Sequence, residues 1–149
     1  MYKNNIAHRD IKLNNILVKY LNKEKTSYKV LLSDFGISNQ IYSLTQKFTA
    51  HAGNQLIMAP EILNDEKYNN KCDLWSFGVI IFQLKTRTVP YKGTVEKAKL
   101  KVIKNKGLTV LNIIDNNEKY LKDLLSKLLV RDPMKRISWK NYFNHQFFK

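Results

Sequence analysis

Residues 8–15 read His8-Arg9-Asp10-Ile11-Lys12-Leu13-Asn14-Asn15, and this stretch decides how the rest of the chain is interpreted. Asp10, Lys12 and Asn15 place a carboxylate, an ammonium and an amide on one short loop, directly before an apolar segment. This set of groups suits phosphoryl transfer. A carboxylate can accept the proton of an attacking hydroxyl, a lysine can neutralise charge on the transferred group, and an amide oxygen can bind Mg²⁺.

A second short motif, Asp34-Phe35-Gly36, follows the apolar segment Tyr28–Leu32, which predicts a strand. Its carboxylate stands at a strand end beside a glycine, which favours a second metal ligand. Taken singly, each triplet is better explained as an ordinary turn, because short motifs often match by chance. The interpretation therefore depends on whether further motifs follow in a consistent order.

Three further motifs do follow, namely Ala59-Pro60-Glu61, Asp73-Leu74-Trp75-Ser76-Phe77-Gly78, and Arg131-Asp132-Pro133 with Arg136. Together the five motifs resemble the signature set of the eukaryotic protein kinase superfamily, over almost the whole chain. The resemblance implies a mainly α fold, the large C-terminal lobe of a protein kinase. In that lobe, short β-hairpins near the N-terminus would carry the catalytic and magnesium loops.

The resemblance also implies roles for individual residues. Asp10 would be the catalytic base, Lys12 would contact the γ-phosphate of ATP, and Asn15 and Asp34 would hold the Mg²⁺ ions. Lys12 and Asn15 would thus also belong to the nucleotide site, with Leu17 beneath the adenine ring; Leu17 could equally be a core residue. A lysine two positions after the catalytic aspartate, as at Lys12, resembles the pattern of Ser/Thr kinases. The implied reaction transfers the γ-phosphate of ATP to Ser or Thr hydroxyls of proteins.

Other matched positions are implied to support the site. In the family, the residue matched by Asp73 braces the backbone of the catalytic loop, and the residue matched by Glu61 pairs with the arginine matched by Arg136. The positions given a structural role by the resemblance are His8, Phe35, Gly36, Glu61, Asp73 and Arg136.

Regulation is implied by Arg9, because an arginine before the catalytic aspartate marks control by a phosphorylated activation loop. Ser43, Thr45 and Thr49 are the candidate phosphorylation sites, and each could instead be a solvated loop hydroxyl. Before Ala59 the family usually has Gly-Thr-Pro-x-Tyr, whereas residues 53–57 read Gly-Asn-Gln-Leu-Ile. Asn54 therefore replaces a threonine of the substrate loop, a departure that bears on substrate docking and efficiency but not on the fold.

Local patterns predict the secondary structure. Two short apolar segments, Ile16–Val18 and Tyr28–Leu32, predict strands of a hairpin with a longish polar turn. Helices are expected at Cys72–Lys85, Thr94–Lys106, Asn117–Val130 and Trp139–Phe148, the first of them apolar on all sides and therefore buried. Strands thus come first and helices dominate afterwards.

Composition sets the class of protein. The chain has 149 residues, with 44% hydrophobic and 26% charged, enough for one folded domain. No apolar run approaches a membrane span, and Cys72 is alone, so we expect a soluble, intracellular, cytoplasmic protein. The net charge of +14 raises the possibility of nucleic-acid binding. Its lysines are scattered, however, and no aromatic RNA-binding strand or zinc ligand set accompanies them, so nucleic acid is not an expected partner.

The glycine-rich loop, the strand lysine and the helix glutamate of a kinase small lobe do not occur within residues 1–149. We therefore expect a partial kinase domain over 1–149 that has little activity alone, with the small lobe of the same kinase and a Ser/Thr protein substrate as partners. The alternative is a non-catalytic, kinase-like protein-binding scaffold, a pseudokinase or truncated relic. At residues 68–76 the chain resembles calmodulin-kinase or calcium-dependent kinases, and at residues 136–145 it resembles ULK-like kinases.

Overall fold

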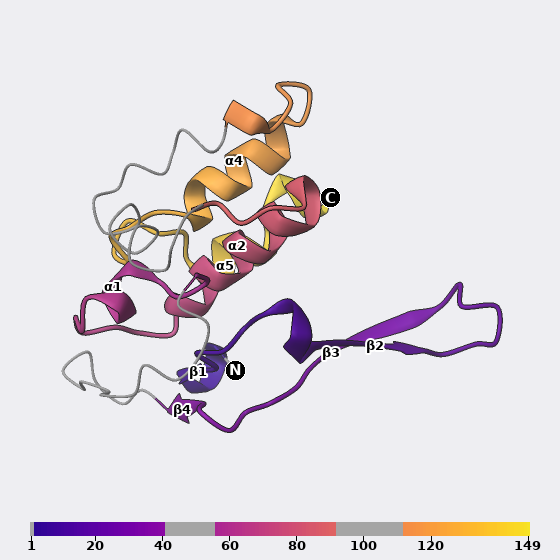
Figure 1. The fold of residues 1–149 in the computed structure, drawn as a ribbon, viewed down its shortest axis with the longest axis horizontal. Helices are drawn as coiled ribbons and strands as arrows, with labels where there is room; N and C mark the ends of the chain where they lie inside the picture. The colour runs from indigo at the N-terminus through magenta and orange to yellow at the C-terminus, as the bar shows by residue number, and fades with distance from the viewer. Residues whose placement is uncertain (1, 41–55, 92–111) are drawn as a thin grey trace.

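The structure is a computed structural model that describes residues 2–40, 56–91 and 112–149 (Figure 1). A small β portion comes first and a helical body follows. The β-strands are β1 (Ile6–Ala7), β2 (Ile16–Tyr20), β3 (Tyr28–Leu32) and β4 (Asn39–Gln40). The α-helices are α1 (Pro60–Leu63), α2 (Cys72–Thr86), α4 (Lys119–Leu128) and α5 (Trp139–Phe143). Short 3-10 helices span Tyr2–Asn4, Leu13–Asn15 and Gln146–Phe148.

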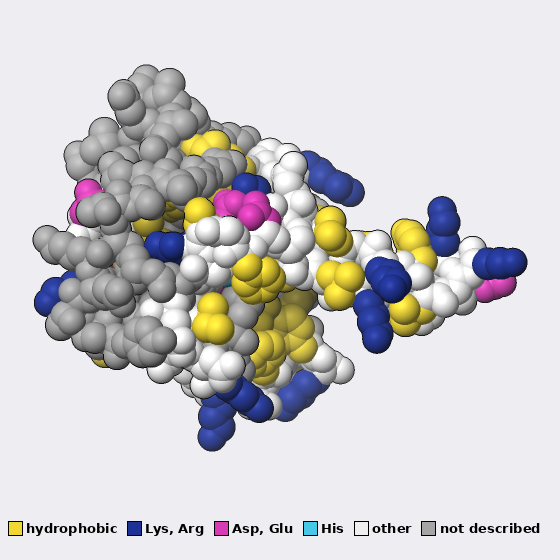
Figure 2. All heavy atoms as spheres, turned by 90° about the horizontal axis from the view of Figure 1, so that it is seen from below, with side chains coloured by type: hydrophobic (Ala, Val, Ile, Leu, Met, Phe, Trp, Pro, Cys, Tyr) yellow, Lys and Arg dark blue, Asp and Glu magenta, His cyan; other side chains and the backbone are white. Residues whose placement is uncertain are grey.

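The predicted hairpin is confirmed, with β2 running on to Tyr20. Strands β2 and β3 are antiparallel, in a register that pairs Ile16 with Leu32 and Tyr20 with Tyr28. Asn22 orders the connecting turn, because its side-chain oxygen accepts hydrogen bonds from the N–H groups of Thr26 and Ser27. The hairpin projects from the helical body (Figure 1), and Figure 2 shows apolar and basic side chains together along it.

A second antiparallel pair, β1 with β4, was not predicted. It joins Ile6 to Gln40 and Ala7 to Asn39. Two-residue strands carry too little sequence pattern to be recognised in advance. The pairing matters for the site because it holds the segment after Asp34 beside the segment that leads into residues 8–15.

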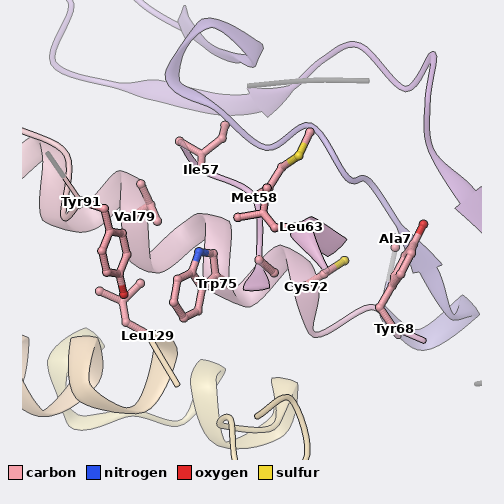
Figure 3. Packing of buried hydrophobic residues seen from close by; sticks show 11 residues of the cluster. Ala7, Ile57, Met58, Leu63, Tyr68, Cys72, Trp75, Val79, Tyr91 and Leu129 are labelled. Carbon is pink, nitrogen blue, oxygen red and sulfur yellow. The ribbon is translucent and has the colours of Figure 1, made fainter. Parts of the chain in front are cut away.

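Helix α2 forms the centre of the body and agrees with its prediction to within one residue. Trp75, on α2, is buried and stacks on Tyr91 at 6.0 Å between ring centroids, next to Val79 and Leu129 (Figure 3). The helix is less enclosed than its sequence indicates, since Leu84 near its C-terminal end is 54% exposed.

Helix α4 packs against α2 through a close approach. A Cβ atom added to Gly78 would lie 2.9 Å from Leu128 Cβ and 2.9 Å from Leu129 Cδ2, so only glycine fits there. The predicted helical spacing of buried leucines is confirmed for α4, at Leu121, Leu124, Leu125 and Leu128. The helix is shorter than the predicted 117–130, because the backbone angles of the flanking residues, at 118 and 129, are not helical.

The prediction of one helix over Trp139–Phe148 is wrong in extent. Helix α5 ends at Phe143, His145 is extended, and a 3-10 turn follows. The His145 ring nitrogen accepts the Phe147 N–H, and the Asn144 side chain donates to the Lys140 carbonyl. These side-chain bonds give the backbone an alternative to a continuous helix. The predicted helix Thr94–Lys106 lies outside the described residues.

Candidate active site

The carboxylate of Asp10 is held at one oxygen only. Asp10 is 6% exposed. Its Oδ2 accepts hydrogen bonds from Lys12 Nζ at 2.5 Å and Asn15 Nδ2 at 3.0 Å. Its Oδ1 is buried and accepts no hydrogen bond from the described part of the chain. A buried carboxylate oxygen without a partner is energetically unfavourable, so this atom is available for a donor that binds from outside.

Asn15 connects the loop to the hairpin. Its amide nitrogen donates both to Asp10 Oδ2 and to the Asp10 carbonyl, at 2.9 Å for the latter. Both bonds use the nitrogen, and neither occupies the amide oxygen, which is a hard ligand. The Asn15 carbonyl accepts from the N–H of Ser33 at 2.8 Å and from its hydroxyl at 3.1 Å. These bonds fix Asn15 beside the strand end that precedes Asp34.

Asp34 offers the second hard oxygen ligand near this point. It is exposed and has a left-handed backbone, with a φ of 63°, and its Oδ1 accepts the Gly36 N–H at 3.3 Å. The described residues contain no cluster of three His, Cys, Asp or Glu side chains that could enclose a metal. Asn15 and Asp34 fit a Mg²⁺ ion that takes its remaining oxygens from a bound phosphate and water, which is the usual manner of Mg²⁺ binding.

Asp73, in the first turn of α2, fixes the start of the loop. Its two carboxylate oxygens accept the backbone N–H groups of His8 at 2.7 Å and Arg9 at 2.9 Å. Burial raises the pKa of Asp73, and these two backbone hydrogen bonds oppose the rise. Arg9 has a φ of 70°, so the bonds hold the loop in a conformation that non-glycine residues rarely adopt.

The side chains of His8 and Arg9 face the segment after Asp34. The Nε2–H of His8 donates to the Ser33 carbonyl at 3.1 Å, and the His8 ring lies 4.7 Å from that of Phe35 between centroids. Arg9 donates from Nε to the Ile37 carbonyl and from Nη1 to the Tyr68 hydroxyl at 3.1 Å. Burial raises the pKa of Tyr68, and the hydrogen bond and positive charge of Arg9 oppose the rise.

A buried ion pair joins α1 to the segment between α4 and α5. Arg136 donates from Nη1 and Nη2 to the two carboxylate oxygens of Glu61, at 2.7 and 2.8 Å. The guanidinium also donates to the carbonyls of Lys71, Val130 and Arg131. The contact that the sequence resemblance implies between these two side chains is therefore present.

The structure brings some candidate residues together and not others. Asp10, Lys12, Asn15 and Asp73 share one hydrogen-bonded network, and Asp34 follows the strand that is tied to it. Leu17 is 49% exposed on β2, so it does not belong to the core of the described residues. Ser43, Thr45, Thr49 and Asn54 lie outside the described residues.

Two supporting residues were missed by the sequence analysis. Ser33 bonds to Asn15 through both its N–H and its hydroxyl, and its position directly before Asp34 was the available signal. Tyr68 holds Arg9 across 59 residues of sequence, and no local pattern reveals such a contact.

Comparison with known families decides the class of this protein. The family model described as protein kinase domain matches residues 1–148. The chain belongs to the protein kinase family. The predicted superfamily is thereby confirmed, and the helices and small antiparallel sheets agree with a kinase fold.

This kinase chain is similar to several curated Ser/Thr kinases. It is 35% identical over 145 residues to "Serine/threonine-protein kinase ATG1b" of Arabidopsis thaliana, covering 97% of this chain and 20% of that protein. It is 34% identical over 150 residues to "Calcium-dependent protein kinase 4" of Plasmodium falciparum, covering 100% and 28%. It is 34% identical over 156 residues to "Putative serine/threonine-protein kinase R517/R518" of Acanthamoeba polyphaga mimivirus, covering 95% and 34%.

The kinase chain spans between a fifth and about a third of the length of these curated relatives. No helix in the described part of the chain is both long and apolar enough to cross a membrane.

Proposed function

We propose that residues 1–149 are the large-lobe part of a protein Ser/Thr kinase, which transfers the γ-phosphate of ATP to Ser or Thr hydroxyls of proteins. The observation that carries the proposal is the asymmetry of Asp10. One oxygen is held by Lys12 and Asn15, and the other is buried without a partner among the described residues. That arrangement suits a base that receives a substrate hydroxyl.

In the proposed reaction, a substrate hydroxyl donates a hydrogen bond to Asp10 Oδ1. Its oxygen attacks the γ-phosphorus, the bond from that phosphorus to the β–γ bridging oxygen breaks, and ADP leaves with the bonding electrons. The hydroxyl proton passes to Asp10. Lys12, already beside the carboxylate at 2.5 Å, neutralises charge on the transferred group. Mg²⁺ bound by Asn15 and Asp34 would supply positive charge that offsets the phosphates.

The remaining roles complete the proposal. Leu17 forms the floor of the adenine site, as its exposure on β2 permits. Arg9 receives a phosphate on Ser43, Thr45 or Thr49, which orders the activation segment. Asn54 contributes to substrate docking in place of the usual threonine.

The proposed activity also needs a small lobe, because phosphoryl transfer depends on positioning of the nucleotide and residues 1–149 contain no glycine-rich loop. We therefore propose that residues 1–149 alone show little turnover. The experiment must use a protein that joins these residues to a kinase small lobe.

The test is the substitution Asp10→Asn in that joined protein. We expect phosphorylation of Ser/Thr peptides with labelled ATP to fall by about 10²–10⁴-fold. The melting temperature should change little, because asparagine keeps the shape of the side chain. Asp115→Asn, the same change in an exposed loop, is the matched control and should leave the rate unaltered. Equal activity in the Asp10 variant would reject the assignment of the base, and a parent without activity would favour the scaffold alternative.

A further inference from the structure

The buried hydroxyl of Tyr68 has no part in the reaction proposed above. Tyr68 is 4% exposed and lies between α1 and α2. Its ring belongs to the apolar cluster that also contains Ala7 and Trp75 (Figure 3). Its oxygen accepts a hydrogen bond from Arg9 Nη1 at 3.1 Å, since a guanidinium can only donate. Packing alone would be satisfied by phenylalanine, so the hydroxyl matters here through its bond to Arg9.

Arg9 connects this hydroxyl to a second segment of the chain. While Nη1 donates to Tyr68, Nε donates to the Ile37 carbonyl at 2.5 Å. Ile37 lies three residues after Asp34, the residue proposed to bind Mg²⁺. An arginine side chain has many rotamers, and its guanidinium is a rigid planar group. A bond that fixes Nη1 therefore also fixes the direction in which Nε donates.

The segment that receives the Nε bond is a tight turn. Asp34 has a φ of 63°, and its Oδ1 accepts the Gly36 N–H at 3.3 Å. The Ser38 N–H donates to the Phe35 carbonyl at 3.0 Å. A residue with a side chain keeps a left-handed backbone only where its surroundings hold it there. The bond to the Ile37 carbonyl, inside this turn, restrains the turn and with it the Asp34 carboxylate.

Tyr68 is itself attached to the helical body by the residues that follow it. The side-chain oxygen of Asn69 accepts the Lys71 N–H at 2.9 Å. Lys71 Nζ donates to the carbonyls of Pro133 and Arg136, at 3.0 and 2.9 Å. These bonds hold the segment after Tyr68 against the loop between α4 and α5. Tyr68 therefore offers Arg9 an acceptor whose position is fixed by the body.

We propose that Tyr68 is a positioning residue for the Mg²⁺ site, because its hydroxyl orients Arg9 and Arg9 holds the turn that carries Asp34. This inference rests on the proposed function, in which Asp34 binds Mg²⁺ together with Asn15. Residues that orient metal ligands typically contribute about 10–100-fold to metal affinity or activity. Tyr68 acts through one further residue, so we expect a smaller effect, of about three- to tenfold.

The first measurement is ATP binding by calorimetry, with and without Mg²⁺, in the protein joined to a small lobe. Tyr68→Phe keeps the ring in the apolar cluster and removes only the hydroxyl. We expect ATP affinity in Mg²⁺ to fall about three- to tenfold, and affinity without Mg²⁺ to change less than about twofold. An equal fall in both conditions would show a general structural role, and no fall in Mg²⁺ would show no role. Either result overturns the proposal.

The parent protein separates this inference from the proposed function. If the parent binds ATP no more tightly with Mg²⁺ than without it, the proposed metal site is rejected, and the role of Tyr68 is rejected with it. If the parent depends on Mg²⁺ and Tyr68→Phe binds ATP as the parent does, only the role of Tyr68 is rejected.

Two further variants test whether the effect passes through Arg9. Tyr142→Phe removes another buried tyrosine hydroxyl, among the aromatic rings of α5, and should alter ATP affinity in Mg²⁺ less than about twofold. Arg9→Met removes the guanidinium, so Tyr68→Phe added to it should cause a further loss of less than about twofold. Losses that simply add, or an equal loss in the Tyr142 variant, would contradict the proposal.

Amide hydrogen exchange without nucleotide tests the position of the turn directly. Tyr68→Phe should speed exchange of the Ser38 amide, which bonds to the Phe35 carbonyl, by about threefold or more. Amides within α4, such as that of Leu125, should exchange as in the parent. Unchanged exchange at Ser38 would show that the turn does not depend on Tyr68, and an equal increase at Leu125 would show general destabilisation. Both results would overturn the proposal.

Discussion

Removal of the Arg136 guanidinium should have the largest effect on stability of any single change in the site. Arg136 and Glu61 are joined by two hydrogen bonds, and their side chains are 0% and 1% exposed. The substitution Arg136→Met keeps much of the volume but leaves the Glu61 carboxylate buried without its cation. It also removes the donors to three backbone carbonyls.

The magnitude follows from that geometry. Breaking a buried ion pair at one partner destabilises a protein by about 3–5 kcal/mol, because a charge stays buried without compensation. With a urea dependence of about 2 kcal/mol per molar, the midpoint should fall by about 1.5–2.5 M. Since a domain is stable by only about 5–15 kcal/mol in total, this loss is a large fraction of its free energy of unfolding.

The assay is urea unfolding followed by tryptophan fluorescence, since Trp75 lies against Arg136 with its ring centre 5.3 Å from the guanidinium carbon. Lys127→Ala, which removes an exposed pair with Asp123, is the control and should cost less than about 0.5 kcal/mol. A cycle that adds Glu61→Gln to Arg136→Met should show coupling, because the second change removes the stranded charge. Additive effects, or a midpoint shift no larger than the control's, would refute the reasoning.

Three further outcomes are expected. Gly78→Ala should lower the melting temperature, because the new Cβ meets Leu128 of α4 and the following Leu129, each at 2.9 Å, and overpacking costs about 1–3 kcal/mol, which exceeds the gain in helix propensity. Burial raises the pKa of Tyr91 from 10.0 to about 12. As pH rises, Tyr91 therefore loses its proton at a lower pH in the unfolded state than in the folded state. The contribution of Tyr91 to the free energy of unfolding should be fully present below pH 10 and fall by about 1.4 kcal/mol per pH unit towards pH 12. Urea titrations at each pH measure this slope, which Tyr91→Phe should reduce. In the protein joined to a small lobe, Asp34→Asn should weaken ATP binding by calorimetry with Mg²⁺ but not without it, and equal affinity of variant and parent in Mg²⁺ would count against the proposed role of Asp34 as a ligand.

Most of the fold could be predicted in segments whose apolar pattern extends over many residues. The α2 prediction was accurate because its apolar pattern continues over fifteen residues, and the hairpin was predictable because two β-branched segments flank a polar turn. The C-terminal helix was overextended for a different reason. Its apolar pattern continues through Phe147 and Phe148, but the backbone N–H of Phe147 bonds to the His145 ring, and such competition is invisible to periodicity.

The candidate site was predictable in composition but not in geometry. The residue types at Asp10, Lys12 and Asn15 indicated phosphoryl transfer, yet nothing in the sequence tells which carboxylate oxygen of Asp10 is held and which is left without a partner. That asymmetry arises because Lys12 and Asn15 both reach the same oxygen. The links through Ser33 and Tyr68 likewise depend on tertiary contacts between distant segments.

Helix α2 connects the stability of the body to the geometry of the loop. The left-handed backbone of Arg9, with a φ of 70°, costs about 1–2 kcal/mol for a residue with a side chain. Two hydrogen bonds to the buried carboxylate of Asp73 offset this cost, since bonds to a charged group contribute about 1.5–3 kcal/mol each. Asp73 can act in this way because it stands in the first turn of a helix whose position is fixed by the contact of Gly78 with α4. A shift of α2 would therefore move Asp73 and release the loop. If the proposed activity is present in the protein joined to a small lobe, Gly78→Ala should reduce its rate even at temperatures where that protein remains folded.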